Sequence, residues 1–378
     1  MKKCHEMKEV GLWDLPEDKV YVKIKRSYRI AFFNYAIKTV GGVTKLANTL
    51  NIKSVRNLYS YKNAELFTPL RIIKKMLSLF SKHKKSYFIK NIEKNIEKIK
   101  TKNGSKPIKN PKLPIKNSPM LCGITGHIIG DGGIYNLNGT FIVHYSNNSQ
   151  FLVNQFKKYI LDVFGDIEIY EFYNKRKKAY RITVPSIIGL ILSIFLRNQN
   201  GDSKHIPEMV LHSNKTYKAF FLRALFDDEG GMNGRAINIG MSNRNVIRKT
   251  KKMLEEFRIK PGKTNKRKLN KNFYNFNITG RHDLERFARG IGFNHPEKKE
   301  KLTVLLKNYK IDRYKKGEME KVILGLLSKN IQMDIYEISK KIKRKPQHRI
   351  RKKLITMEKK NMIKSKTGKF YKKIYHLN

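Results

Sequence analysis

Two acidic residues, Asp131 and Glu229, each stand at the end of an apolar stretch and directly before a glycine. The first stretch reads Ile-Thr-Gly-His-Ile-Ile-Gly-Asp-Gly over residues 124–132, and the second reads Leu-Arg-Ala-Leu-Phe-Asp-Asp-Glu-Gly over residues 222–230. Apolar residues at helical spacing predict that each acid ends a helix. The negative end of a helix dipole is an unfavourable place for a carboxylate.

Two such acids brought together would also repel each other, and a divalent cation between them would remove both penalties. Hard oxygen ligands suit Mg²⁺ (or Mn²⁺). A single acid-glycine helix end usually indicates only a capped helix, whereas two copies at matching points favour a composite metal site. Gly126, Gly130 and Ala224 would let the two helix backbones approach closely. Gly132 and Gly230 suit the left-handed residue that ends many helices.

The elements predicted around the two acids repeat along the chain, and the acids themselves lie 98 residues apart. The first unit comprises a helix at 120–132, strands within 133–147, a helix at 150–164, a hairpin of 167–173 and 178–184, and a helix at 186–196. The second comprises a helix at 217–230, a strand at 236–241, a helix at 244–257, a basic hairpin at 266–279 and a helix at 282–292. We predict a duplicated αββαββα domain of the α+β class over residues 120–312, with repeats 120–212 and 213–312 related by a pseudo-two-fold axis.

These residues resemble the LAGLIDADG homing endonucleases, in the form that carries two motifs in one chain. The resemblance covers residues 120–310, about half the chain. Outside the two acidic motifs it includes Lys-His-Ile-Pro at 204–207. It also includes Ile-Thr-Gly at 278–280, Phe287, Gly-Ile-Gly-Phe at 290–293, Lys298 and Leu302. His127 replaces a usual aliphatic residue, and Ala224 replaces the first glycine of the motif. Alanine is still small, and His127 is expected to be a packed or partly exposed helix residue rather than a ligand.

The resemblance implies that Asp131 and Glu229 hold divalent metals at the foot of two central helices. The metals would activate water, polarise the scissile phosphates and stabilise the leaving oxygens. The family often places a basic residue near the water, for which Lys204 and Lys298 are the candidates. A solvated surface lysine is the alternative for each.

The resemblance also implies that the two hairpins of each repeat form a saddle on the DNA major groove. Basic and polar residues predicted to contact DNA there are Arg176, Lys177, Lys178, Arg181, Lys266, Arg267, Lys268 and Asn275. Of the two acids that precede Glu229, Asp227 and Asp228, one is expected to cap or solvate the helix end rather than bind metal.

The charge of the whole chain also indicates nucleic acid as the partner. The formal net charge is +52, from 82 Lys+Arg against 30 Asp+Glu, and neutralised phosphates release counterions and add affinity. An acidic membrane surface is the rival partner, but no apolar run reaches about 18–20 residues, so no membrane is expected. Cys4 and Cys122 are too few for a disulfide framework or a zinc site. A reducing cytoplasm, association with the nucleoid through DNA, and no small-molecule cofactor are expected.

The N-terminal block, residues 1–81, is predicted to be a helical helix-turn-helix domain. Helices are expected at 27–38, 43–50, 54–61 and 68–80, and Lys53, Arg56 and Asn57 would contact DNA. A plain helical bundle with a solvated basic face is the alternative. Residues 82–119 are predicted to be a basic helix, up to residue 102, and then a Pro/Lys/Asn linker without regular structure.

The C-terminal block, residues 313–378, has the helix, helix, helix, hairpin order of a winged-helix domain. Helices are expected at 318–327, 333–342 and 347–361, and a hairpin at 364–375. Arg349, Lys352 and Lys353 would lie on the candidate recognition helix. A basic structural cap is the alternative.

Together these observations favour a Mg²⁺-dependent endonuclease that cuts both strands of a long asymmetric double-stranded DNA site and acts as a monomer. The main rival is a transcription regulator that kept the saddle and lost the cutting, and an RNA-binding splicing helper is a third possibility. The chain opens Met-Lys-Lys and ends His-Leu-Asn. It therefore lacks the terminal residues that an intein needs for splicing, and a free-standing protein is expected.

Overall fold

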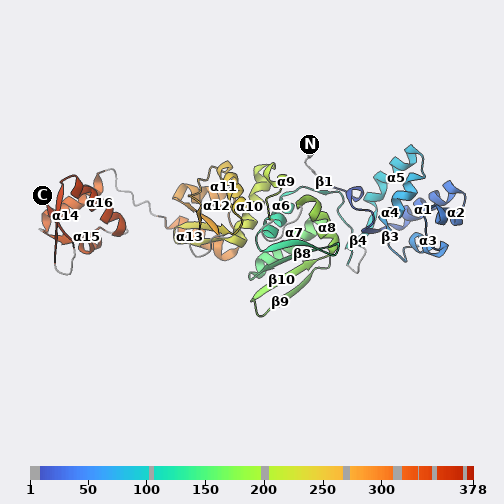
Figure 1. Ribbon diagram of the computed structural model, residues 1–378, viewed down its shortest axis with the longest axis horizontal. Coiled ribbons are helices and arrows are strands. Elements are labelled where there is room, and N and C mark those ends of the chain that lie inside the picture. Colours follow the sequence, from blue (N-terminus) through green and yellow to red (C-terminus); the bar gives the residue numbers. More distant parts are fainter. Residues whose placement is uncertain are drawn as a thin grey trace. The chain divides into compact units, whose positions relative to one another are not determined.

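The computed structural model describes residues 9–101, 106–196, 204–266, 273–309, 317–330, 332–342, 347–368 and 373–378. The chain divides into two compact units, Met1–Lys307 and Asn308–Asn378, and Figure 1 shows the elements of each. No helix in the described ranges is long and apolar enough to cross a membrane.

The first unit begins with a mixed region of short strands and helices. In chain order these are β1 (Glu9–Val10), a 3-10 turn (Leu12–Asp14), β2 (Val20–Ile24), α1 (Arg26–Val40), α2 (Val43–Thr49), α3 (Val55–Lys62), β3 (Thr68–Pro69), α4 (Leu70–Ser78), α5 (Lys82–Lys94), β4 (Ile96–Thr101), β5 (Ile108–Lys109) and β6 (Ile115–Lys116). The predicted pair of short helices is present as α2 and α3. Ser54 caps α3 by accepting a hydrogen bond from the Arg56 amide at 3.1 Å.

The predicted helical domain and linker are wrong in one respect, because strands from both segments form one sheet with the order β3-β2-β4-β5. Strand β2 pairs with β4, Val20 opposite Thr101, and β4 pairs with β5. The segment expected to lack regular structure contains β5 and β6. Ile99 and Ile108 are buried in a core that continues into the first repeat, so apolar burial outweighs the basic, proline-rich composition here.

Two helix–hairpin–helix–hairpin–helix repeats follow, as predicted. The first comprises α6 (Pro119–Ile129), β7 (Gly132–Leu137), β8 (Thr140–Asn147), α7 (Gln150–Phe164), β9 (Tyr170–Asn174), β10 (Ala179–Val184) and α8 (Ser186–Leu196). After α9 (Glu208–Leu211), the second comprises α10 (Lys215–Glu229), β11 (Gly230–Asn233), β12 (Ala236–Met241), α11 (Arg244–Glu256), β13 (Asn265–Lys266), β14 (Tyr274–Thr279) and α12 (Arg281–Gly290), and α13 (Pro296–Lys307) then closes the unit. The sheets have matching strand orders, β7-β8-β10-β9 and β11-β12-β14-β13. The predicted duplicated α+β fold is confirmed.

The two motif helices, α6 and α10, pack directly against each other. A Cβ atom on Gly126 would lie 2.5 Å from the Phe221 carbonyl oxygen and 2.8 Å from the Ala224 Cβ. Because real Cβ contacts do not come so close, this crossing requires glycine at position 126 of α6, directly against the backbone and the small Ala224 side chain of α10. The helix ends, and therefore Asp131 and Glu229, are held together by this backbone approach.

Each sheet buries one face under helices. Strand residues Val143, Tyr145 and Ile182 are buried in the first repeat, as are Ile239 and Phe276 in the second. Side chains alternate along a strand, so the residues between them lie on the opposite face of each sheet.

The second unit has its own apolar core, which includes Ile323, Ile338, Ile350 and Leu354. Its elements are α14 (Glu318–Lys329), β15 (Met333–Asp334), α15 (Ile335–Lys341), α16 (Gln347–Lys359), β16 (Ile363–Thr367) and β17 (Lys373–Leu377), with the sheet order β15-β17-β16. The predicted order of three helices and a hairpin is present. Short strand β15 precedes α15, where the sequence predicted only a helix.

Candidate active site

The two acids occupy matching places at the ends of the motif helices. Helix α6 ends at Ile129, and Asp131 follows immediately before β7; α10 ends at Glu229 itself, and β11 begins at the next residue. The expected left-handed glycines are wrong: Gly230 has φ −91°, and Gly132 is not among the residues with positive φ. Glycine is needed for space instead, since a Cβ on Gly230 would lie 2.6 Å from the Phe226 carbonyl oxygen.

Asp131 is held by an amide from the neighbouring strand. Asn147 Nδ2 donates to Asp131 Oδ2 at 2.8 Å and also lies 3.3 Å from Asp228 Oδ1. Loss of solvation, followed by the charge of Asp228, raises the pKa of Asp131 to about 6, while the Asn147 hydrogen bond and the charges of Lys298 and Lys204 act against this increase. The Asp131 side chain is itself exposed, so water moderates the loss of solvation.

Glu229 is the more strongly perturbed of the two acids. Burial, then the charges of Asp131 and Asp228, raise its pKa to about 7, against the opposing charges of Lys204 and Lys298. Like charges near a partly buried carboxyl favour its neutral form. A cation bound beside Glu229 would therefore stabilise its ionised form.

Lys204, in the segment before α9, and Lys298, on α13, each contact the end of one motif helix. Lys204 Nζ donates to the carbonyl oxygens of Ile129 and Gly130, at 3.0 and 2.9 Å. Lys298 Nζ donates to the Gly230 carbonyl oxygen at 2.6 Å and also to that of Asp227. Burial lowers the pKa of both lysines, although the nearby acids oppose the effect. Neither is a solvated surface lysine, since each places a positive charge at the negative end of a motif helix.

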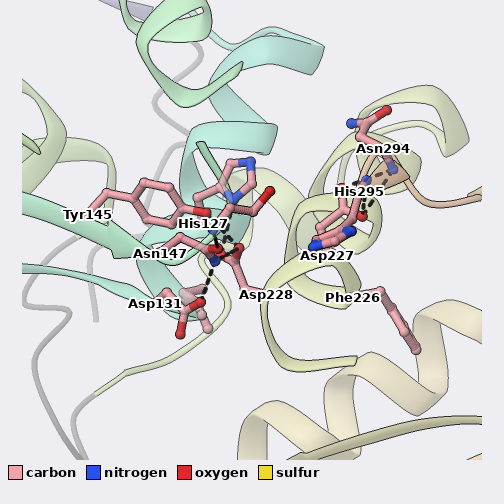
Figure 2. A network of polar contacts seen from close by, with 12 residues as sticks. His127, Asp131, Tyr145, Asn147, Phe226, Asp227, Asp228, Asn294 and His295 are labelled. Atoms are coloured by element: carbon pink, nitrogen blue, oxygen red, sulfur yellow. Dashed lines mark hydrogen bonds and ion pairs between the residues drawn. The ribbon is translucent and has the colours of Figure 1, made fainter. Parts of the chain in front are cut away.

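A buried network that sequence reasoning missed joins the two motif helices (Figure 2). His127 Nδ1 on α6 lies 3.0 Å from Asp228 Oδ2 on α10, and both side chains are fully buried. Tyr145 OH donates to Asp228 Oδ1 at 2.7 Å. Burial alone would lower the pKa of His127, but the Asp228 carboxylate outweighs it and raises the pKa. His127 is thus packed, as expected, but it is also an ion-pair partner.

Asp227 stabilises a different helix from its own. Its carboxylate accepts hydrogen bonds from the backbone amides of Asn294 at 3.0 and 3.1 Å and His295 at 3.0 Å, just before α13 begins. This contact anchors the helix that carries Lys298. The side chain is buried, and it acts as a cap, as expected for one of the two acids that precede Glu229.

A groove of about 570 Å³ opens beside these groups and draws its lining from both repeats. Its polar lining includes Asp131, Asn147, Asp228, His295 and Lys298. Within the described part of the chain, no three His, Cys, Asp or Glu side chains are grouped to hold a metal ion. Asp131 lines this groove, whereas Glu229 ends the other motif helix and is not part of its lining.

The predicted DNA-contacting residues of the two repeats have different settings. Arg176, Lys177 and Lys178 are exposed in the turn between β9 and β10, and Arg181 lies within β10. Lys266 pairs with Tyr274 and so lies on the opposite face of its sheet from Asn275. Arg267 and Lys268 lie outside the described residues.

The predicted contacts of the flanking regions are mostly exposed. Lys53 and Arg56 are exposed at the start of α3 and Asn57 is half-buried; Arg349 and Lys352 are exposed on α16. Lys353 differs, because its Nζ forms an ion pair with Glu320 Oε1 on α14 at 2.5 Å. That lysine supports the packing of the C-terminal unit.

Comparisons with known proteins match the central part of the chain. Residues 216–292 match the family described as LAGLIDADG-like domain. The chain is 28% identical over 194 residues to the replication factor C small subunit of Thermococcus kodakarensis and 27% identical over 221 residues to a glutamine–fructose-6-phosphate aminotransferase of Methanocaldococcus jannaschii. These matches take in 51% and 54% of this chain but only 22% and 19% of the relatives. The chain thus spans about a fifth of each, and their differing activities are not transferred to it.

Solved structures with a similar fold include the homing endonuclease I-DmoI in complex with DNA and Ca, at 18% identity and TM-score 0.39, covering 49% of this chain and 97% of that one. Another is full-length DUF199/WhiA from Thermatoga maritima, at 15% identity and TM-score 0.38, covering 64% and 90%. The family match spans the second motif helix and most of the second repeat. Residues 216–292 are therefore similar to a LAGLIDADG-like domain, and the first repeat has the same order of elements.

Proposed function

We propose that this protein is a site-specific double-stranded DNA endonuclease of the homing type that hydrolyses phosphodiester bonds with a divalent metal held by Asp131 and Glu229. The observation that carries the proposal is the pair of perturbed carboxylates at matching ends of two helices in backbone contact. Stability alone gives no reason to keep two acids there, because each is disfavoured by the helix dipole and by its acidic neighbours.

The donor set fits Mg²⁺ or Mn²⁺. Mg²⁺ is commonly bound through one or two carboxylates, with substrate phosphates and water as the other ligands, and the described residues offer two carboxylates. A metal bound there would polarise a scissile phosphate and lower the pKa of an attacking water. Asn147 would orient Asp131 for this role, and Lys204 and Lys298 would limit the negative charge at the helix ends.

The remaining parts of the chain would lengthen the contact with DNA. We propose the α2–α3 pair as a helix-turn-helix module, which exposes basic residues at the start of α3. We propose the C-terminal unit as a winged-helix module, which exposes basic residues on α16. With both motifs in one chain, a single copy can present the whole saddle, and we propose that the protein acts as a monomer.

The experiment that tests this function is cleavage of a genomic fragment library by the full chain, with Mg²⁺ and separately with EDTA, followed by mapping of the ends. Recurrent ends at one sequence, produced only with Mg²⁺ or Mn²⁺, support the endonuclease. Protection of a sequence upstream of a gene without nicking in either metal would instead indicate a regulator that binds and does not cut.

A further inference from the structure

The sheet of the second repeat carries an unusual row of asparagines on the face away from its helices. Ile237 opposite Ile278 and Ile239 opposite Phe276 are buried, so the alternate pairs lie on the other face. Register places the following residues together on that face: Gly231, Asn233, Ala236, Asn238, Gly240, Asn265, Asn275, Asn277 and Thr279. Five of these paired positions are asparagine, and none is charged.

Two of these amides are arranged to meet a ligand. Asn238 Nδ2 donates to Asn277 Oδ1 at 2.6 Å and to the Phe276 carbonyl oxygen at 3.4 Å, so Asn238 serves to fix the Asn277 amide, whose nitrogen is directed away from the contact. Asn275 makes no side-chain hydrogen bond with any described residue and is half-buried. Around a Cβ placed on Gly231 no atom lies within 4 Å, whereas a Cβ on Gly240 would lie 2.6 Å from the Phe273 ring, so a flat group can approach the sheet closely at Gly231.

An asparagine amide carries one acceptor and a donor side by side. In the major groove this pair matches adenine, which presents the N6 donor beside the N7 acceptor, whereas guanine presents two acceptors and is matched by arginine. A face with five amides and no arginine or lysine at its paired positions therefore favours adenine.

The corresponding face of the first sheet has different chemistry. Arg181 lies opposite Ser146 and Phe172, and Thr183 lies opposite His144 and Tyr170. Arg181 Nε is buried without a hydrogen-bond partner among the described residues, so this donor of its guanidinium is unused within the protein. Arginine reads guanine through O6 and N7.

We propose that the DNA target is asymmetric in composition: the half under the second repeat is read at adenines by Asn275 and Asn277, and the half under the first repeat is read at guanine by Arg181. This inference rests on the proposed DNA-binding function but not on cleavage. It assigns the specificity of each half-site to the side chains on one sheet face.

The test is selection of bound sequences from a randomised duplex library by the full chain, in Ca²⁺ so that cutting does not interfere. The expected motif has adenines concentrated in one half and guanine in the other, with each adenine preferred by roughly 5- to 150-fold over other bases. Asn275→Asp should move the preference at its position from adenine to cytosine, because a carboxylate accepts from cytosine N4. Asn275→Ala should lose the preference there without gaining another.

The matched control is Asn245→Asp, the same charge change at an exposed position of α11, on the helix-covered side of the sheet. It should leave the motif unchanged, and Arg181→Ala should relax only the guanine half. A motif without enriched adenines, or an Asn275→Asp variant that selects the parent motif, overturns the inference while DNA binding stands. If the parent chain enriches no sequence at all, the proposed function fails as well.

Discussion

At the scale of single residues, the site places the acidic side chains of Asp131, Asp228 and Glu229 close enough together for their charges to interact. Asp131 and Glu229 have raised pKa values because burial and acidic neighbours disfavour their ionised forms. Lys204 and Lys298 reduce this cost, yet their ammonium groups are bound to helix-end carbonyls rather than paired directly with either acid. The ionised acids therefore destabilise the metal-free protein.

Glu229→Gln should raise the free energy of unfolding at pH 8 without metal. The pKa of Glu229 rises from 4.5 to about 7 on folding, so the folded state binds more protons between these values and stability falls as pH increases through that window. After allowance for partial solvent access, removing the charge should contribute about 1–2 kcal/mol. Thermal melting should show the gain at pH 8 and lose it near pH 4.

Glu255→Gln on α11, an exposed glutamate, is the control and should not change the melting temperature by a similar amount. A Glu229→Gln variant that is less stable than the parent at pH 8 would show that the acid is stabilised in the fold.

Lys298→Met should lower the cleavage rate by about 10- to 100-fold at neutral pH and shift the pH profile upwards. The lysine charge opposes the increase in the Glu229 pKa, so its loss makes Glu229 harder to ionise and metal harder to bind. Single-turnover rates between pH 6 and 9 measure both effects. Lys299→Met, at the next and exposed position of α13, should retain the parent pH profile. If both substitutions have equal effects, Lys298 contributes only to the overall positive charge of the protein.

At the scale of elements, the two motif helices are joined by small residues on one side and by a buried ion pair on the other. Gly126 and Ala224 permit the approach, while His127 and Asp228 hold it through a charge contact across the interface. Asn147 extends this contact to Asp131. The positions of both motif ends are thus coupled through Asp228.

His127→Leu should destabilise the protein by about 3–5 kcal/mol, because it leaves a buried carboxylate without its ion-pair partner. The double variant His127→Leu with Asp228→Asn should recover a large part of that loss, and the coupling energy should lie within about 0.5–3 kcal/mol. Urea unfolding of the four chains completes the cycle. Strictly additive losses would mean that the pair makes no specific contribution.

Much of the central fold could be predicted because its periodicity is strong: helices α7 and α8 and strand β12 have the predicted bounds. The composite acid site could be predicted because the motif occurs twice. The His127–Asp228 contact could not, since its partners are 101 residues apart and each is unremarkable alone. Strand β4 was predicted as part of a basic helix, because the lysines between and after its buried positions Ile96 and Ile99 obscure the apolar pattern.

At the scale of the whole molecule, positive charge is spread over every region of the chain, with a formal net charge of +52. Charge of this kind gives affinity for any duplex and does not itself select a sequence. The C-terminal unit, Asn308–Asn378, has its own core and exposes Arg349 and Lys352. We expect it to add affinity rather than chemistry.

Removal of residues 308–378 should weaken DNA binding and make it less sensitive to salt, while cleavage at saturating protein remains. Each lost phosphate contact lowers the slope of log affinity against log salt by about 0.9. Binding titrations between 50 and 300 mM KCl measure this slope for the full and shortened chains. An unchanged slope would show that the C-terminal unit does not contact DNA.

We propose that the carboxylates of Asp131 and Glu229 make the DNA-binding saddle a nuclease. The most direct measurement compares the parent with the double variant Asp131→Asn and Glu229→Gln on the mapped target. DNA binding in Ca²⁺ and cleavage in Mg²⁺ are measured for both chains. We expect the double variant to bind the target as well as the parent and to leave it uncut. A double variant that cleaves at the parent rate would contradict the assignment of these acids as the metal site.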